Sequence, residues 1–230
     1  MGNKDSIINR LQSAIPAVLP SMLLCDFSRL REEVEALENA GVAALHLDVM
    51  DGVFVPNFTY GLTIVEATRR STDLPLDVHL MMVHPEKYVE SFVATGADIL
   101  TIHAEAVENP ISVLKQIDAA GCVAGLAINP MTSVASIADA IPFCDLVLVM
   151  SVNAGFGGQA FLSDVLQKFA QIRQCQGGED VLLQIDGGIN NQTIAAADQA
   201  GADLFVAGSA IFKADDYCQA ITQLESSLAR

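Results

Sequence analysis

Four side chains capable of metal binding or proton transfer stand toward the ends of three apolar segments of this sequence. They are His46, Asp48, His79 and Asp186. Each segment is rich in residues that form buried β-strands. Side chains two residues apart on a strand point to the same face, so His46 and Asp48 share a face. If the three strands are parallel neighbours in one sheet, all four side chains meet at its carboxyl-terminal edge.

Imidazole and carboxylate groups together form a donor set that suits zinc, iron, manganese or cobalt. The pattern therefore favours one divalent metal ion held by His46, Asp48, His79 and Asp186, with zinc as the first candidate. A cluster of hydrogen-bonded polar groups is the alternative, because buried polar side chains usually pair with one another. His103 ends another apolar segment and is expected beside this site, as an outer partner or a packing residue.

The two aspartates can also transfer protons. Inverting a carbon next to a carbonyl removes a proton from one face and supplies one to the other, which two carboxylates on opposite sides of a substrate accomplish. A metal ion on the substrate oxygens would stabilise the enediolate between the two steps. Asp48 and Asp186 are therefore the candidate acid and base.

Glycine clusters that follow the last three apolar segments form a candidate phosphate site. The residues are Gly155, Phe156, Gly157, Gly158, Gly187, Gly188, Gly208 and Ser209. Backbone N–H groups of such loops hold phosphate in many α/β barrels. One Gly-Gly pair alone is more typical of a turn, but three successive clusters favour a phosphate cradle. Met50, Met81 and Met150 are expected either to fill the core or to line the substrate cavity.

Strand-like segments recur roughly every 27 residues, which is the length of one strand, one helix and two short loops. They cover residues 17–21, 43–48, 76–80, 98–103, 122–128, 145–150, 181–186 and 203–208. Apolar residues at helical spacing fill the gaps, for example between Leu30 and Ala40 before Gly41 and again around residues 134–138. The alternation predicts a (β/α)₈ TIM barrel with its active site at the carboxyl ends of the strands, and a doubly wound open sheet is the weaker alternative.

The segment before the first strand is predicted to form a short extra helix, because Ile7, Leu11 and Ile15 have helical spacing. We expect residues 1–16 to be an N-terminal extension and residues 17–230 to be a single catalytic domain. The extension lacks the continuous apolar stretch of a signal peptide. Nowhere does the sequence approach the roughly 18 consecutive apolar residues that indicate a membrane span.

The 230-residue chain carries a formal charge of −16, and 51% of its residues are hydrophobic. This acidity argues against nucleic acid or an anionic membrane as a partner, but backbone amides can still bind a small phosphorylated ligand. The five cysteines are scattered and never form a Cys-x-x-Cys pair, which indicates reduced thiols and a cytoplasmic protein. A homo-oligomer is a further expectation for an acidic barrel with an added helix.

Taken together, the motifs resemble those of the ribulose-phosphate 3-epimerase family from about Leu19 to Leu224. The matching segments are residues 20–21, 46–52, 55–57, 77–81, 151–153, 155–159, 186–188 and 207–212. The family is a metal-dependent (β/α)₈ barrel that interconverts ribulose 5-phosphate and xylulose 5-phosphate at C3, in the pentose phosphate pathway and the Calvin cycle. The resemblance therefore implies an isomerase of carbohydrate metabolism with a small phosphorylated sugar as substrate.

The resemblance also implies a role for each candidate residue. The metal ligands would be His46, Asp48, His79 and Asp186. Asp48 would accept the proton and Asp186 would donate one in one direction, with the roles exchanged in the other. Ser21 and His79 would contact the substrate, and the glycine clusters would hold it chiefly by its phosphate.

This chain departs from the family pattern at Leu19, Val53, Leu62, Ala154 and Gln184. Ala154 replaces the usual proline, a change that can loosen the loop expected to close over the site. Gln184 replaces a usual glutamate on the strand that carries the second aspartate, which removes a negative charge near the metal and can alter the proton affinity of that aspartate.

Three other functions remain open. An epimerase of a hexulose 6-phosphate, such as allulose 6-phosphate, would use the same mechanism behind a mouth reshaped by Val53 and Phe58. A decarboxylase or aldolase would need a lysine at a strand end, and no lysine of this chain falls there. A non-catalytic sugar-phosphate-binding barrel would lack an acid or base, whereas Asp48 and Asp186 are both present.

Overall fold

The eight predicted apolar segments form the eight parallel strands of one sheet. The computed structural model describes residues 4–155 and 159–229. The strands are β1 (Ala17–Pro20), β2 (Leu45–Met50), β3 (Leu76–Met81), β4 (Ile99–His103), β5 (Val123–Ile128), β6 (Leu146–Met150), β7 (Leu182–Asp186) and β8 (Leu204–Ala207). All strand residues except Asp186 are buried, as expected for parallel strands covered on both faces.

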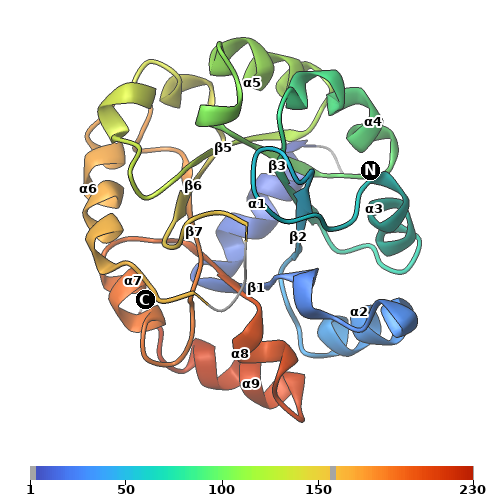
Figure 1. Ribbon diagram of the computed structural model, residues 1–230. Helices are drawn as coiled ribbons and strands as arrows, with labels where there is room; N and C mark the ends of the chain where they lie inside the picture. The colour runs from blue at the N-terminus through green and yellow to red at the C-terminus, as the bar shows by residue number, and fades with distance from the viewer. Residues whose placement is uncertain (1–3, 156–158, 230) are drawn as a thin grey trace.

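The sheet closes into a barrel. Its strands follow the order β1-β8-β7-β6-β5-β4-β3-β2, and each pairs in parallel with its neighbour. A parallel bridge between Ser21 and His46 joins the two end strands of this order. Figure 1 shows the strands around a central axis with helices outside them. The predicted (β/α)₈ barrel is therefore confirmed.

Helices precede, connect and follow the strands, and those after each strand pack their apolar faces on the outside of the barrel. They are α1 (Lys4–Ala14), α2 (Leu30–Asn39), α3 (Leu62–Arg69), α4 (Val89–Ala94), α5 (Pro110–Ala119), α6 (Gln167–Arg173), α7 (Ile194–Gln199), α8 (Ser209–Phe212) and α9 (Tyr217–Glu225). In α2, Val34 and Leu37 form the buried face that the helical spacing predicts. At the end of α4 the chain reverses through Gly96, whose φ of +96° suits glycine and few other residues.

Short 3₁₀ turns complete the connections. They are η1 (Met22–Leu24), η2 (Phe27–Arg29), η3 (Pro85–Lys87), η4 (Ala104–Ala106), η5 (Val134–Ile137), η6 (Ile141–Phe143) and η7 (Ser163–Leu166). The helical pattern predicted between β5 and β6 takes the form of η5 and η6 rather than an α-helix. Pro142 lies inside η6, where its fixed ring and missing N–H oppose a longer helix.

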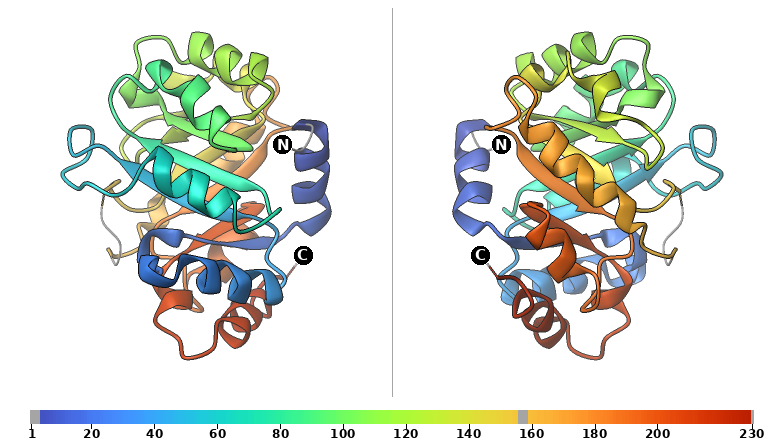
Figure 2. Two further views of the ribbon diagram at one scale, coloured as in Figure 1. Left: turned by 90° about the vertical axis from the view of Figure 1, so that its right-hand side faces the viewer. Right: turned by 90° about the vertical axis from the view of Figure 1, so that its left-hand side faces the viewer.

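The extra helix α1 covers the amino-terminal end of the barrel. Its buried residues Ile7 and Leu11 join one apolar cluster with inward-facing residues such as Leu146, Leu182 and Leu204. In Figure 2, α1 lies across the end of the barrel opposite the projecting loop between β2 and α3. The helix is present as predicted, whereas a domain boundary at residue 16 stays a prediction.

Within residues 4–155 and 159–229, no helix combines the length and the apolar character needed to cross a membrane.

Candidate functional site

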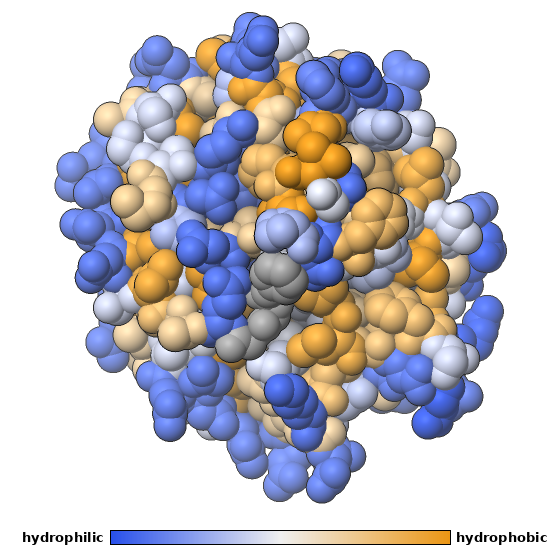
Figure 3. Space-filling view, viewed as in Figure 1, coloured by the Kyte–Doolittle hydropathy of each residue, from blue (hydrophilic) through white to orange (hydrophobic). Residues whose placement is uncertain are grey.

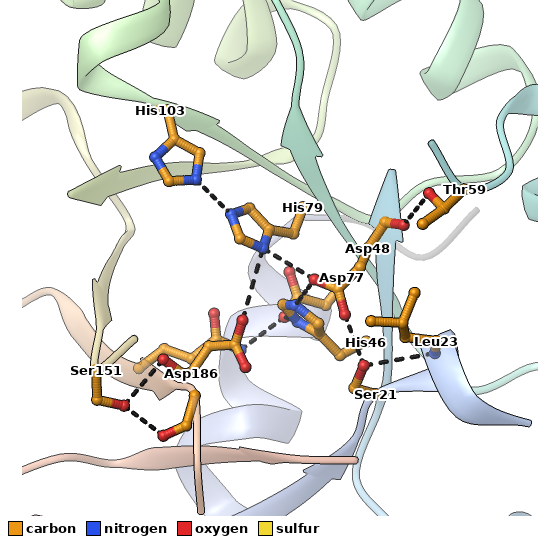
Figure 4. A network of polar contacts seen from close by, with 12 residues as sticks. Ser21, Leu23, His46, Asp48, Thr59, Asp77, His79, His103, Ser151 and Asp186 are labelled. Carbon is orange, nitrogen blue, oxygen red and sulfur yellow. Dashed lines mark hydrogen bonds and ion pairs between the residues drawn. The ribbon is translucent and has the colours of Figure 1, made fainter. Parts of the chain in front are cut away.

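The four predicted ligand residues meet at the carboxyl-terminal end of the barrel. Strands β2 and β3 pair with Asp48 opposite His79, and β7 ends in Asp186. One ligand atom from each of His46, Asp48, His79 and Asp186 lies within 4.8 Å of all the others. Figure 4 shows these side chains pointing toward one another, from the neighbouring strands β2 and β3 and from β7 across the barrel. The group could hold a metal ion.

His46 lies between two carboxylates. Its Nδ1 is 2.7 Å from Asp77 Oδ2, and its Nε2 is 3.2 Å from Asp48 Oδ1. The amide of Gln184 donates to the same Asp77 oxygen at 2.6 Å. Asp77 was not among the predicted site residues, although its place two residues before His79 on one strand face was a usable signal. Gln184 therefore contacts the outer partner of His46, and it does so across the barrel.

His79 is enclosed in a similar way. Its Nδ1 is 3.1 Å from Asp48 Oδ1 and 3.9 Å from Asp186 Oδ2. On its other side, His79 Nε2 lies 2.8 Å from His103 Nε2, and His103 Nδ1 lies 3.2 Å from Glu105 Oε2. The structure thus places His103 as an outer contact of His79. Glu105 was missed by the sequence reasoning, although it follows His103 at a spacing of two.

These contacts fit a divalent cation. In each histidine one ring nitrogen meets an outer partner, and the other faces Asp48 Oδ1, at 3.2 Å for His46 and 3.1 Å for His79. Two nitrogen atoms and a carboxylate oxygen that converge in this way match the donor chemistry of a metal site. Outer hydrogen bonds that fix the ligand rings are equally typical of such sites. The residues present therefore suit the metal ion that the sequence predicts.

The surroundings of the two aspartates shift their pKa values in opposite directions. Burial opposes the charge of Asp48, but the adjacent His46 and His79 outweigh it and hold the pKa of this carboxyl well below its usual range. Burial raises the pKa of Asp186 to about 7, and the negative charge of Asp48 adds to this rise. In the protein alone at neutral pH, Asp48 is a proton acceptor and Asp186 can hold a proton. Two carboxyl groups separated in this way suit an acid and a base.

The histidines also differ in proton affinity. Burial disfavours the charged form of His46, but Asp77 and Asp48 overcome it and raise the pKa of this imidazole well above its usual value. Burial lowers the pKa of His79, and it lowers the pKa of His103 to about 4. The rings of His79 and His103 are therefore neutral in the protein alone at neutral pH.

A cavity of about 220 Å³ opens beside the four residues. Of the predicted substrate-binding residues, those that line it are Ser21, Met50, Met81, Met150, Gly155, Gly187, Gly188, Gly208 and Ser209. His79 is fully buried behind this lining. Phe156, Gly157 and Gly158 lie outside the described residues. Gln159 and Asn190 also line the cavity and were not predicted.

Two of the lining glycines have backbone geometry that other residues rarely adopt. Gly187 has a φ of +118°, and a Cβ there would lie 2.6 Å from Val152 Cγ2. Gly155 has a φ of +120°, and a Cβ there would lie 3.0 Å from Val55 Cβ. Glycine at both positions lets the loops after β6 and β7 pack closely against Val55 and Val152.

Side-chain hydrogen bonds tie the loops around the cavity together. Ser151 Oγ donates to the carbonyl of Gly187 at 2.6 Å, and Ser21 Oγ donates to Asp48 Oδ2 at 2.6 Å. Asn57 Nδ2 donates to the carbonyl of Gly155 at 2.8 Å, which joins the loop after β2 to the loop after β6. The departure at Ala154 is therefore next to a loop-to-loop contact.

The loop between β2 and α3 exposes two large apolar side chains. Val53 and Phe58 are 71% and 75% exposed, and neither is part of the cavity lining. Apolar side chains gather on this face of the molecule, as Figure 3 shows. The departure at Val53 is therefore exposed on this loop and outside the cavity wall.

Comparisons with known proteins agree with this geometry. The family described as the ribulose-phosphate 3 epimerase family matches residues 17–212. A ribulose-phosphate 3-epimerase of Bacillus subtilis is 45% identical over 213 residues, covering 91% of this chain and 98% of that protein. A protein of the same name from Synechocystis is 47% identical, with 91% and 93% covered. The chloroplastic ribulose-5-phosphate-3-epimerase of Arabidopsis thaliana is 42% identical, with 97% and 81% covered.

Solved structures of lower identity share the fold. A 3-hexulose-6-phosphate synthase superposes with a TM-score of 0.70 at 19% identity, covering 93% of this chain and all of that one. Tryptophan synthase of Mycobacterium tuberculosis superposes with a TM-score of 0.71 at 13% identity, with 99% and 98% covered. These likenesses support the barrel alone. The sequence relatives and the family match are more specific, and they show that this chain belongs to the ribulose-phosphate 3-epimerase family.

Proposed function

We propose that this protein is a metal-dependent epimerase that interconverts D-ribulose 5-phosphate and D-xylulose 5-phosphate at C3. The observation that carries the proposal is the pair Asp48 and Asp186, which face one cavity with pKa values displaced in opposite directions. Membership of the family supports the choice of reaction, and the names of the relatives support the choice of sugar.

The two carboxyl groups divide the proton transfers. Asp48, ionised at neutral pH, removes the proton from C3 on one face of the sugar. Asp186, whose raised pKa lets it hold a proton, delivers one to the opposite face. In the reverse reaction the roles are exchanged. A divalent cation held by His46, Asp48, His79 and Asp186 would supply positive charge to the substrate oxygens as negative charge develops on them.

The remaining lining residues bind and orient the sugar. Ser21 holds Asp48 through its hydroxyl, which fixes the direction of the base. Gly155, Gly187 and the Gly208-Ser209 pair surround the cavity, and their backbone amides would take the phosphate without requiring a basic side chain. Met50, Met81 and Met150 give the cavity an apolar wall that excludes water from the reacting carbon.

Zinc is the metal that we propose, because two imidazoles with two carboxylates suit it well, although manganese, iron and cobalt accept the same donors. Loading the metal-free protein with each ion in turn and comparing turnover identifies the working metal. We propose the cytoplasm as its compartment, since its five cysteines are free thiols. A homo-oligomer is also proposed, and sedimentation of the purified protein tests it.

Proton NMR in deuterated buffer tests the proposed reaction. Ribulose 5-phosphate is incubated with the metal-loaded protein and, separately, with protein treated with a chelator. We expect deuterium to enter at C3 and xylulose 5-phosphate to appear, and both to stop after chelation. Absence of exchange with metal-loaded protein would contradict the proposal.

The hexulose alternative is tested in the same way. The exposed Val53 and Phe58 are the observation that favours it, because they make the surface of the loop between β2 and α3 apolar. Allulose 6-phosphate replaces ribulose 5-phosphate, and the two kcat/KM values are compared. A higher value for the hexulose would transfer the proposal to that sugar while leaving the acid, the base and the metal site unchanged.

A further inference from the structure

A line of hydrogen-bonding groups runs outward from His79 through His103 to Glu105. The two Nε2 atoms of the histidines are 2.8 Å apart, and His103 Nδ1 is 3.2 Å from Glu105 Oε2. Both imidazoles are fully buried, and the ring of Phe54 covers His103 with ring centroids 4.8 Å apart. The rings have no contact with bulk water, so each nitrogen that faces this line must find its partner within it.

Glu105 sets the direction of these hydrogen bonds. An ionised carboxylate only accepts, so His103 Nδ1 carries the hydrogen. The other nitrogen of a neutral imidazole then accepts, and His79 Nε2 must be the donor to it. His79 Nδ1 is left with a lone pair that faces Asp48 Oδ1 at 3.1 Å. A lone pair at this position is what a metal ligand requires.

Groups from the loop after β5 hold Glu105 in place. Its Oε1 accepts from the backbone N–H of Asn129 at 2.8 Å and from the hydroxyl of Thr132. The ammonium of Lys168 on α6 donates to the carbonyls of Asn129 and Thr132 at 2.8 Å and 2.7 Å. These contacts occupy one carboxylate oxygen and turn the other toward His103.

His46 needs the opposite tautomer. Its Nδ1 lies 2.7 Å from Asp77 Oδ2 and carries the hydrogen there, while its Nε2 faces Asp48. His46 therefore meets a carboxylate directly, whereas His79 reaches Glu105 through a second histidine. The tautomer of His79 therefore depends on two further residues, His103 and Glu105. The direction of the hydrogen bonds between them can be reversed without substituting a metal ligand.

We propose that His103 and Glu105 are positioning residues that hold His79 as its Nε2–H tautomer, so that the Nδ1 lone pair faces the metal ion. The inference rests on the metal site of the proposed function. Neither residue lines the cavity, so both act through His79.

Glu105→Gln should reverse the direction of the hydrogen bonds from Glu105 to His79. Its carbonyl oxygen keeps the donors of Asn129 and Thr132, which places the amide N–H opposite His103 Nδ1. His103 then becomes the Nε2–H tautomer and drives the hydrogen of His79 to Nδ1. Two-bond proton–nitrogen NMR spectra of the metal-free protein distinguish the tautomers, with 4 histidines to assign. Zinc affinity, measured by competition with a chelating dye, should fall about 10- to 100-fold.

Glu86→Gln is the matched control, because Glu86 lies 3.3 Å from the exposed His84, outside the site. It should leave the tautomers of the buried histidines and the zinc affinity as they are in the wild type. If Glu105→Gln behaves like this control while the wild type binds zinc, the inference is wrong. If the wild type binds no zinc, the metal part of the proposed function fails instead, and the tautomers of the metal-free protein still decide the inference.

Two substitutions at His103 give an independent test. His103→Gln keeps an oxygen that can accept from His79 Nε2, so zinc affinity should stay within about threefold of the wild type. His103→Leu removes the acceptor, and zinc affinity should fall about tenfold or more. Thermal melts of both variants establish that they are folded. Equal zinc affinities in the two folded variants would overturn the positioning role.

Discussion

The interior of the barrel is polar at its carboxyl-terminal end and apolar at its amino-terminal end. At the carboxyl-terminal end, histidines and carboxylates fill the interior and hydrogen-bond to one another, as around His46 and Asp48. At the amino-terminal end, Leu11 of α1 packs into a cluster with inward-facing residues such as Leu146 and Leu182. The same strands therefore hold the candidate catalytic side chains at one end and buried apolar side chains that stabilise the fold at the other. Barrels of this class separate function from stability in this way.

Burial affects the free energy of the two ends differently. Burial of Asp186 raises its pKa to about 7, so the protein disfavours the ionised form of this group. Burial of the leucine cluster stabilises the folded protein, because no charged group loses its contact with water there. Substitutions at the two ends should therefore separate activity from folding.

Asp186→Asn should give the largest effect, on activity alone. The amide fills the same space but transfers no proton, so kcat/KM for epimerisation should fall at least about 10²- to 10⁴-fold. The free energy of unfolding of the metal-free protein should not fall, because a carboxyl that resists ionisation is replaced by a neutral group. Steady-state kinetics and urea unfolding measure the two quantities. A large loss of stability would mean that the site end also holds the fold together.

Leu11→Ala should give the converse result. Leu11 is fully buried, and truncation of such a leucine costs about 2 to 5 kcal/mol of unfolding free energy. Urea unfolding should show this loss, while kcat/KM of the folded protein stays at the wild-type value. Gln12→Ala, on the exposed face of the same helix, is the control and should change neither quantity. An equal fall in activity for the folded Leu11→Ala variant would couple the two ends.

Both ends were partly predictable from the sequence, for different physical reasons. The period of two along β2 and β3 predicted which side chains share a face, and the order of the strands then brought His46, Asp48, His79 and Asp186 together. Helical spacing predicted α1 and its buried face at Leu11. These features depend on local periodicity, which a single sequence contains.

The outer partners of the site were not predictable in the same way. Gln184 donates to Asp77 across 107 positions of the chain, and this pairing depends on how the barrel closes. The contact between His79 and His103 depends on the rotamers of two rings on adjacent strands. Neither contact can be predicted from the local periodicity of the sequence. The 3₁₀ turns η5 and η6 show a further limit, since apolar spacing alone does not separate them from an α-helix.

Gly125→Ala should test the layer between the two ends. A Cβ at Gly125 would lie 2.1 Å from Thr101 Oγ1 and 2.9 Å from Thr101 Cβ. Such overpacking costs about 1 to 3 kcal/mol of unfolding free energy. Thr101 Oγ1 has no hydrogen-bond partner among the described residues, so Thr101→Ala removes the nearest clash without breaking a bond.

Urea unfolding of the single and double variants measures this coupling. The double variant should regain part of the lost stability, with an interaction free energy of at least about 0.5 kcal/mol. Thr101 pairs in register with His79, so a fall in kcat/KM for Gly125→Ala would show that strain in the middle layer reaches the site. Additive free energies for the two substitutions would mean that the Thr101 side chain is not the source of the strain.

Lys4→Met should give the smallest effect and identify what holds α1 in place. Lys4 Nζ pairs with Asp118 and lies 2.8 Å from Asp145 Oδ2, and its side chain is 21% exposed. An ion pair near the surface contributes about 0.2 to 1 kcal/mol, well below the loss expected for Leu11→Ala.

The pH dependence of this loss has a definite sign. Burial opposes the charge of Lys4, but Asp118 and Asp145 outweigh it and raise the pKa of this ammonium. The stability that the pair contributes is therefore complete below the ordinary lysine pKa of about 10.4 and disappears as the pH rises through the higher pKa of the folded protein. Urea unfolding of the wild type and Lys4→Met at pH 8 and in strongly alkaline buffer should show the difference closing. A loss as large as that of Leu11→Ala would mean that charge, rather than buried leucine, fixes α1 to the amino-terminal end.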